Sequence, residues 1–300
     1  MRKLIIGKNG QIGRQLLHHL SHDRETIAIG RHDLDLARPE TVYQTLQEYQ
    51  PDVILNAAAY TQVDAAENDP TIAMAINASS VAEMAHYGAN HKVLLIHYST
   101  DYVFDGTKPA PYTETDTPNP LSVYGHSKKQ AEDAILKSGC PHLILRTSWV
   151  YDQTRKNFPN TILALAQQQD HLDVVADQFG APTHAELIAS LTLTCMNQHL
   201  QASRDGDRTA DGIYNLAAGG KTSWHEFARY LVEGATRRGV ALACSTENIL
   251  PVAATLRPGT AIRPQNSRLD CTKICTEFNL TIYSWQDAAD RFLNHWVKNA

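Results

Sequence analysis

The sequence predicts an α/β fold, a doubly wound parallel sheet followed by a smaller C-terminal lobe. Short, continuously apolar runs alternate with longer segments of helical periodicity through the first half of the 300 residues. Continuous apolar runs are typical of parallel strands that helices cover on both faces. After Trp149 the alternation becomes irregular and prolines and glycines are frequent, which indicates a second, smaller lobe.

Each element follows from its own pattern, taken in chain order. Residues 3–7 are apolar and predict the first strand, and residues 11–20 follow with apolar side chains at helical spacing. Further strands are predicted at 26–30, 52–56, 93–97 and 142–147. Further helices are predicted at 39–49, 72–87, 127–137 and 285–298.

The composition excludes several classes of function. Basic residues number 27 and acidic residues 32, for a net charge of −5, so the chain lacks the basic excess of nucleic-acid and anionic-membrane binders. No apolar run approaches the roughly 18 residues of a membrane helix, and the run after Met1 is too short for a signal peptide. The five cysteines are scattered without a Cys-x-x-Cys pair, as in reduced cytoplasmic proteins. We therefore expect a cytoplasmic protein without nucleic-acid or membrane partners.

No metal site is predicted. The 14 histidines are dispersed along the chain and suit solvated or packing roles. Cys271 and Cys275 are one helical turn apart, but no histidine or further cysteine lies near them in the sequence.

A glycine-rich turn separates the first strand from the first helix. Glycines at positions 7, 10 and 13 let a backbone approach a pyrophosphate closely, and the free N–H groups at the helix start attract its negative charge. A plain strand-to-helix turn is the alternative, which the position after an N-terminal apolar strand disfavours. The residues expected to bind the phosphates are Gly7, Asn9, Gly10, Gln11, Ile12 and Gly13.

The end of the second predicted strand indicates which cofactor is used. Gly30 stands where an acid that binds the ribose of NAD is expected, and Arg31 follows it. An arginine can bind the 2′-phosphate of NADP, so we expect NADPH, with NADH also usable. The alternative is a solvated surface arginine.

Tyr124 and Lys128 are candidates for the chemistry. Four residues apart in a helix, they lie on one face, and an ammonium near a phenol lowers its pKa toward neutrality. Thr100 follows an apolar strand, at the carboxyl edge where ligands bind in open α/β sheets.

These motifs and their order resemble the extended short-chain dehydrogenase/reductase family, whose members have a Rossmann-type fold. The resemblance also covers Asn56-Ala-Ala-Ala at 56–59, Asn77 and the segment His-Tyr-Ser-Thr-Asp-Tyr-Val-Phe at 97–104. It implies that Thr100, Tyr124 and Lys128 act together in catalysis. It further implies cofactor contacts from Arg31, Asn56, Ala57, Ala58, Tyr60, Tyr124 and Lys128.

Segments of the second half are similar to the dTDP-4-dehydrorhamnose reductases within that family. They are residues 146–151, 177–183, 213–224 and 263–269. The resemblance implies NADPH-dependent reduction of the C4 keto group of dTDP-4-dehydro-β-L-rhamnose to dTDP-L-rhamnose, the last step of dTDP-rhamnose biosynthesis for O-antigen. The substrate contacts that it implies are Thr100, Asp101, Val103, Phe104, Tyr124 and Trp149.

The predicted domains follow from this resemblance. Residues 1–149 are expected to form the dinucleotide-binding domain, to which a segment at about 174–215 returns. Residues 150–300 are expected to be mainly the substrate-binding lobe.

Several alternatives stay open. Sugar 4,6-dehydratases carry an Asp-Glu pair after the threonine, whereas Asp101 is followed here by Tyr102, which favours reduction over elimination. A reductase of another 4-keto nucleotide sugar, or a regulatory subunit such as the beta subunit of methionine adenosyltransferase, would have the same fold. Trp149 could be only a core residue. Three arginines could hold the substrate diphosphate or be solvated: Arg257, Arg263 and Arg268.

The sequence leaves the oligomeric state open, with a homodimer as one alternative. Some reductases of the family use Mg²⁺ between subunits, through a glutamate early in the first helix. Here Arg14-Gln15 occupy that place, which argues against Mg²⁺.

Overall fold

The computed structural model describes residues 1–154, 157–207, 210–254 and 260–298. Its centre is a six-stranded parallel sheet in the order β10-β5-β4-β3-β1-β2. In that order the strands are β10 (Gly212–Asn215), β5 (His142–Thr147), β4 (Leu94–Thr100), β3 (Val53–Asn56), β1 (Lys3–Ile6) and β2 (Thr26–Ile29). The chain runs from β1 outward to β2 and then returns to β3 on the other side of β1. This reversal leaves a crevice at the carboxyl ends of β1 and β3, the usual ligand site of such sheets.

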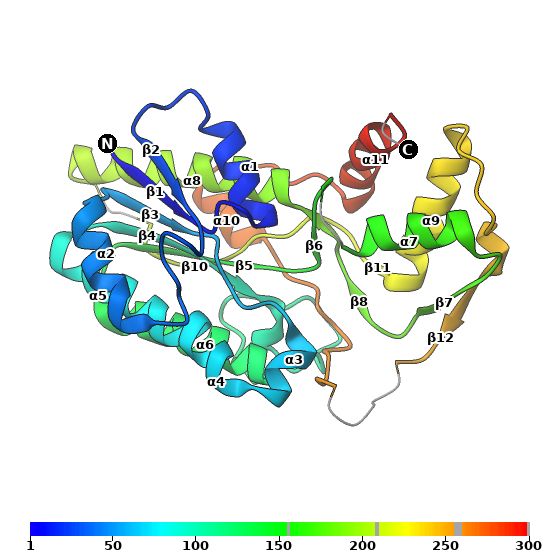
Figure 1. Cartoon of the computed structure of the whole chain (residues 1–300), viewed down its shortest axis with the longest axis horizontal. Helices are drawn as coiled ribbons and strands as arrows, with labels where there is room; N and C mark the ends of the chain where they lie inside the picture. Colours follow the sequence, from blue (N-terminus) through cyan, green and yellow to red (C-terminus); the bar gives the residue numbers. More distant parts are fainter. Residues whose placement is uncertain (155–156, 208–209, 255–259, 299–300) are drawn as a thin grey trace.

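Helices cover both faces of the sheet, which confirms the predicted doubly wound α/β class (Figure 1). One face carries α1 (Gln11–His19), α8 (Ala185–Asp205) and α10 (Thr272–Glu277). The other carries α2 (Val42–Tyr49), α5 (Ser80–His91) and α6 (Val123–Ser138). Alternate strand residues enter the two cores: Leu4 and Ile6 pack toward α2 and α5, and Ile5 packs toward α1.

Shorter helices join these elements. They are η1 (Pro39–Thr41), α3 (Val63–Asn68), α4 (Pro70–Met74), the π-helical turn η2 (Ala75–Ser79), the 3₁₀ turn η3 (Asp101–Val103) and the 3₁₀ turn η4 (Thr246–Asn248). The helix predicted at 72–87 is therefore interrupted: α4 passes through η2 into α5. π-helical turns often occur at functional sites, and this one presents Asn77.

Two boundaries differ from the prediction in ways that matter for the site. The strand predicted at 93–97 continues to Thr100 as part of β4, so His97 and Thr100 lie on one strand. The helix predicted at 127–137 begins four residues earlier as α6, because the Ser122 hydroxyl caps it by accepting a hydrogen bond from Gly125 N (3.1 Å). Tyr124 consequently lies in the first turn of α6.

The remaining elements build a second lobe beside the sheet (Figure 1). Its strand pairs are β7 (Leu172–Val175) with β12 (Ile249–Val252), β8 (Phe179–Gly180) with β11 (Thr222–Ser223), and β6 (Val150–Tyr151) with β9 (Thr183–His184). Its helices are α7 (Phe158–Gln168), α9 (Trp224–Arg237) and α11 (Trp285–Trp296), with Phe227 and Phe292 fully buried between them. From this half of the chain, α8 packs on α1 and β10 pairs with β5. The predicted domain division at residue 149 stays a prediction.

A buried ion pair ties α6 to the sheet. Arg146 donates through Nε and Nη2 to the two carboxylate oxygens of Glu132 (2.8 and 2.7 Å), and Ser99 Oγ donates to the same carboxylate (2.6 Å). Arg146 and Glu132 are each 1% exposed. Buried charges are tolerated only when they are paired in this way, so the pair fixes α6 against β4 and β5.

Removing one partner of this pair should destabilise the fold strongly. Arg146→Met leaves the Glu132 carboxylate buried and unpaired, so we expect a loss of about 3–5 kcal/mol in the free energy of unfolding, measured in urea. Glu132→Gln/Arg146→Met, which removes both charges, should recover much of that loss. Arg237→Met is the control, because Arg237 forms only an exposed pair with Glu233. Equal stability of the two Arg146 variants would contradict the assignment.

Candidate active site

The glycine turn after β1 is shaped so that only glycine fits at two positions. Gly7 has φ +90°, and a Cβ there would lie 2.7 Å from Ala58 N. A Cβ on Gly13 would overlap the carbonyl oxygen of Gly7. The N-cap of α1 is Gly10, which offers no side-chain hydrogen bond to the first N–H groups of the helix. Those donors are directed at the crevice, which suits a phosphate.

A cavity of about 310 Å³ opens beside this turn. Seven of the residues predicted to bind the cofactor line it: Gly7, Asn9, Gly10, Arg31, Ala57, Ala58 and Tyr60. Leu34, Leu36 and Ile76 add an apolar wall of the kind that accepts an aromatic base. The residues present therefore fit a dinucleotide with its pyrophosphate at the start of α1.

Arg31 lies at the rim of this cavity with its side chain 73% exposed, and its Nε is 3.4 Å from Asp35 Oδ1. Lys8 brings a second cation to the same rim, because its stem lies against Gly30 and its Nζ is 3.1 Å from Asp33 Oδ2. The sequence analysis missed Lys8, although its position inside the glycine turn was a usable signal.

Two predicted cofactor residues direct their side chains elsewhere. Gln11 Nε2 donates to the Val150 carbonyl (3.1 Å), and Asn157 Nδ2 donates to Gln11 Oε1 (3.3 Å). The Ile12 side chain packs into the core between the sheet and α8. Any cofactor contact of these two residues is therefore restricted to their backbone.

Asn77 fixes the loop that follows β3. Its Oδ1 accepts from Tyr60 N (2.8 Å), and its Nδ2 donates to the Tyr60 carbonyl (3.0 Å) and to Ser127 Oγ (3.0 Å). The loop that lines the cavity is thereby joined to α6. A buried asparagine within a helical pattern was the sequence signal for this role.

Thr100 and Tyr124 meet at the carboxyl end of β4. The Tyr124 hydroxyl is hydrogen-bonded to Thr100, whose Oγ1 also donates to Asp101 Oδ1 (3.1 Å) and accepts from Tyr102 N (3.2 Å). Gly125 allows this approach, because a Cβ there would overlap the Tyr102 carbonyl. Burial raises the pKa of Tyr124 to about 12, and the Thr100 hydrogen bond offsets part of that rise. The predicted lowering of this pKa by Lys128 is therefore wrong for this structure, and Tyr124 is a protonated phenol at neutral pH.

Lys128, one turn further along α6, is 1% exposed. Its Nζ lies 2.9 Å from Nε2 of His97, a partner that the sequence analysis did not predict. Burial lowers the pKa of Lys128 to about 7, and the Glu132 carboxylate opposes that shift. A lysine with such a pKa can change its charge under working conditions, as functional lysines do.

The predicted substrate residues differ in accessibility. Asp101 is buried beside Thr100, and burial raises the pKa of its carboxyl to about 7. Val103 and Phe104 have no exposed surface, because they pack in a closed cluster where Phe104 stacks on Tyr112 (4.2 Å between ring centroids). Their side chains are core residues in this structure, and substrate contact by them is restricted to the backbone.

Trp149 is half-buried and occupies a left-handed backbone conformation with φ +48°. It stacks face to face on Trp224, with ring centroids 3.5 Å apart, and Gly180 lies against the indole as well. A backbone conformation of this kind is costly for a large residue and is common at ligand sites. The alternative of a simple core tryptophan fits less well with its partial exposure.

The three candidate arginines for the diphosphate lie in different settings. Arg263 forms an ion pair with Asp64 (2.7 Å), which lies in the first turn of α3. Arg268 donates to Asn266 Oδ1 (2.8 Å) and to the Pro109 carbonyl. Arg257 lies outside the described residues.

Within the described ranges, no group of three or more His, Cys, Asp or Glu could hold a metal ion, and no helix is long and apolar enough to cross a membrane. Arg14 forms an ion pair with the buried Asp152, so the start of α1 presents a cation where metal-using reductases have an acid.

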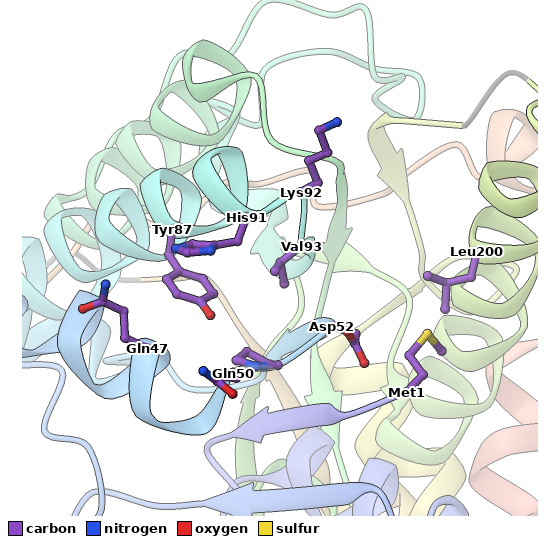
Figure 2. Close-up of a pocket in the computed structure, with 10 residues that line it drawn as sticks. Met1, Gln47, Gln50, Asp52, Tyr87, His91, Lys92, Val93 and Leu200 are labelled. Atoms are coloured by element: carbon purple, nitrogen blue, oxygen red, sulfur yellow. The ribbon is translucent and has the colours of Figure 1, made fainter.

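A second, larger cavity of about 640 Å³ lies at the other edge of the sheet (Figure 2). Asp52 and Val93, which precede β3 and β4, line it together with Tyr87 and His91 of α5. Because parallel strands have their amino ends at one edge, this cavity is opposite the crevice that holds Thr100 and Tyr124. It contains none of the predicted site residues.

Comparison with known proteins agrees with this geometry. The family model described as RmlD substrate binding domain matches residues 1–298. The chain is 41% identical over 298 residues to dTDP-4-dehydrorhamnose reductases of Shigella flexneri and Salmonella typhimurium, covering 98% of this chain and 97% of each relative. Its structure is similar to that of the Bacillus anthracis dTDP-4-dehydrorhamnose reductase in complex with NADP, with a TM-score of 0.86, 30% identity, and coverage of 98% and 99% of the two chains. With a glycine turn shaped for close backbone approach and with Thr100 and Tyr124 meeting at the carboxyl end of β4, the chain belongs to the dTDP-4-dehydrorhamnose reductase family.

Proposed function

We propose that this chain catalyses the NADPH-dependent reduction of dTDP-4-dehydro-β-L-rhamnose at C4 to dTDP-L-rhamnose, the last step of dTDP-rhamnose biosynthesis. The observation that carries the proposal is the meeting of Thr100 and Tyr124 at the carboxyl end of β4, with Lys128 one turn further along the same helix, in a chain whose glycine turn opens a dinucleotide-sized cavity. The match to relatives that are named as reductases of this substrate extends over almost the whole chain.

Each residue of the site has its own role in the reaction. When bound, NADPH supplies the hydride that C4 receives. Tyr124 gives its phenolic proton to the oxygen that becomes the C4 hydroxyl, and Thr100 hydrogen-bonds the same oxygen. As an ammonium, Lys128 stabilises the phenolate that Tyr124 becomes.

The surroundings of Asp101 favour reduction over sugar dehydration. An elimination needs a base at C5, and the residue after Asp101 is Tyr102, whose phenol has a pKa raised by burial. A protonated phenol cannot serve as that base. Carbonyl reduction requires only a proton donor, which Tyr124 supplies.

The proposed setting of the enzyme is the cytoplasm. All five cysteines are free, as is usual where thiols are kept reduced. The homodimer considered for the chain stays a prediction, to be measured by light scattering.

The direct test is turnover of dTDP-4-dehydrorhamnose with NADPH, followed at the nicotinamide absorbance, with the product identified as dTDP-L-rhamnose. Turnover of a different 4-keto nucleotide sugar in preference would redirect the assignment. Absence of NADPH oxidation with either substrate would favour the regulatory-subunit alternative.

Replacing the proposed proton donor tests the chemistry. Tyr124→Phe should keep the fold and NADPH affinity but lower kcat by roughly 10²–10⁴-fold, the usual contribution of a positioned acid. Tyr98→Phe is the control, because this buried tyrosine of β4 bonds Thr192 Oγ1 (3.0 Å) on the opposite face of the sheet. Near-normal turnover of Tyr124→Phe, with chemistry rate-limiting, would refute the role.

Arg31 is the basis of the predicted cofactor preference. A guanidinium can bind a 2′-phosphate through two parallel hydrogen bonds, but at 73% exposure we expect the contact to change affinity only roughly tenfold. Arg31→Ala should weaken NADPH binding by that factor and leave NADH binding unchanged. Arg38→Ala is the control, since this exposed arginine pairs with Glu40 outside the cavity. An unchanged preference in Arg31→Ala would assign the selectivity to Lys8 instead.

The pairing of Arg14 with Asp152 generates a prediction about metal. A cation at the start of α1 disfavours Mg²⁺ there, so turnover should be unaffected by excess EDTA. Loss of activity on chelation, with recovery on adding Mg²⁺, would show that a metal is required.

A further inference from the structure

His97 connects Lys128 to the strand that borders the cofactor cavity. It lies fully buried on β4, with 0% exposure, directly beside Asn56 of β3 in the register of the sheet. Its Nε2 is 2.9 Å from Lys128 Nζ, and its Nδ1 is 3.1 Å from Asn56 Nδ2. Asn56 in turn accepts a hydrogen bond through Oδ1 from Ala58 N (3.3 Å), a residue that lines the cavity.

The donors and acceptors in these contacts determine where the proton of His97 lies and whether Lys128 is charged. A backbone N–H can only donate, so the Asn56 oxygen faces Ala58 and the Asn56 NH₂ group faces His97. The NH₂ group can also only donate, so Nδ1 of His97 must be the acceptor and carries no proton. A neutral imidazole then has its proton on Nε2 and donates it toward Lys128 Nζ. Nζ can accept that bond only as a neutral amine.

We propose that His97 is a positioning residue that sets the protonation state of Lys128, by presenting an Nε2–H donor whose orientation Asn56 and Ala58 impose. The inference rests on the proposed function for its catalytic meaning, because Lys128 acts there as an ammonium. Converting Lys128 to the ammonium requires His97 to move its proton to Nδ1, and Asn56 must then turn its oxygen away from Ala58. The charge on Lys128 is therefore coupled to the loop that lines the cofactor cavity.

The other charged or titratable groups around Lys128 do not set its protonation state in place of His97. Glu132 lies one turn further along α6 and favours the ammonium, but its two oxygens are taken by Arg146 and Ser99. Tyr124, one turn earlier on the same helix, is a neutral phenol. The only hydrogen bond of Nζ found among the described residues is the one to His97. The pKa values agree in direction: burial lowers that of His97 well below its ordinary value, and lowers that of Lys128 to about 7.

The tautomer of His97 is the direct test. Long-range ¹H–¹⁵N spectra of ¹⁵N-histidine-labelled protein, assigned with His97→Gln, should show the proton of His97 on Nε2 at pH 8. A proton on Nδ1 at that pH overturns the proposal. This measurement needs no substrate, so it stands or falls separately from the reductase assignment.

Two substitutions that remove the Nε2–H donor should both raise the pKa of Lys128, followed by ¹⁵Nζ-lysine NMR. In His97→Gln the amide can turn its oxygen toward Nζ, which accepts from the ammonium, so the pKa should rise by about one unit. In His97→Leu the donor to the neutral amine is lost while burial still acts, so the pKa should rise, but by less than in His97→Gln. His142→Gln is the control, because this buried histidine of β5 bonds the Cys140 carbonyl (2.8 Å) away from the site. A fall or no change of the pKa in His97→Leu overturns the proposal, because burial alone would then set the protonation of Lys128.

The pH dependence of kcat should shift in the same direction as the pKa of Lys128. The ammonium of Lys128 is the active form, so activity is lost as the pH rises through its pKa. The alkaline limb of kcat should therefore move to higher pH in both variants, and further in His97→Gln than in His97→Leu. A purely structural role of His97 would lower kcat at all pH values without moving the limb. If the NMR shifts occur but no sugar is reduced, the function proposal fails while the proton assignment holds.

Discussion

Lys128 is a long basic side chain that is buried between α6 and β4. The chemistry of the crevice depends on how this burial affects the charge of Lys128. A buried ammonium without a carboxylate partner is costly, so its charge is sensitive to small changes nearby. Glu132 would neutralise it, but Arg146 and Ser99 already engage that carboxylate. Lys128 is consequently left with a neutral imidazole, which makes its protonation adjustable.

Close packing also determines the shape of the cofactor side of the crevice. The glycine turn can lie against the end of β3 only because Gly7 and Gly13 have no side chains. That close approach places Ala58 in the cavity beside the start of α1. Ala58 N donates to Asn56, and Asn56 contacts His97, which is the partner of Lys128. The two halves of the site are therefore built on one packing contact between the ends of β1 and β3.

Local patterns made much of this site predictable. Glycine spacing, a Tyr-x-x-x-Lys helix and a threonine after an apolar strand are all readable within a few residues of sequence. The partner of Lys128 was not, because Lys128 meets His97 only through the packing of α6 on β4. Asn56 in turn meets His97 only through the register of β3 with β4. The stacking of Trp149 on Trp224 was hidden for the same reason, since the two residues come from separate segments of the second lobe. Phe104 looked like a ligand contact in sequence, and only its tight stack on Tyr112 reveals a core residue.

The first turn of α1 explains how the two lobes keep a common geometry. Its backbone N–H groups are directed at the crevice, while its side chains reach the other lobe: Gln11 bonds Val150 and Asn157, and Arg14 pairs with the buried Asp152. Asn157 is also the N-cap of α7, so these bonds join the starts of two helices from different lobes. A helix that binds phosphate through its backbone has its side chains free for this second task. The first turn of α1 therefore contacts both lobes: its backbone continues the glycine turn, and its side chains hold Asp152 and the start of α7 against it.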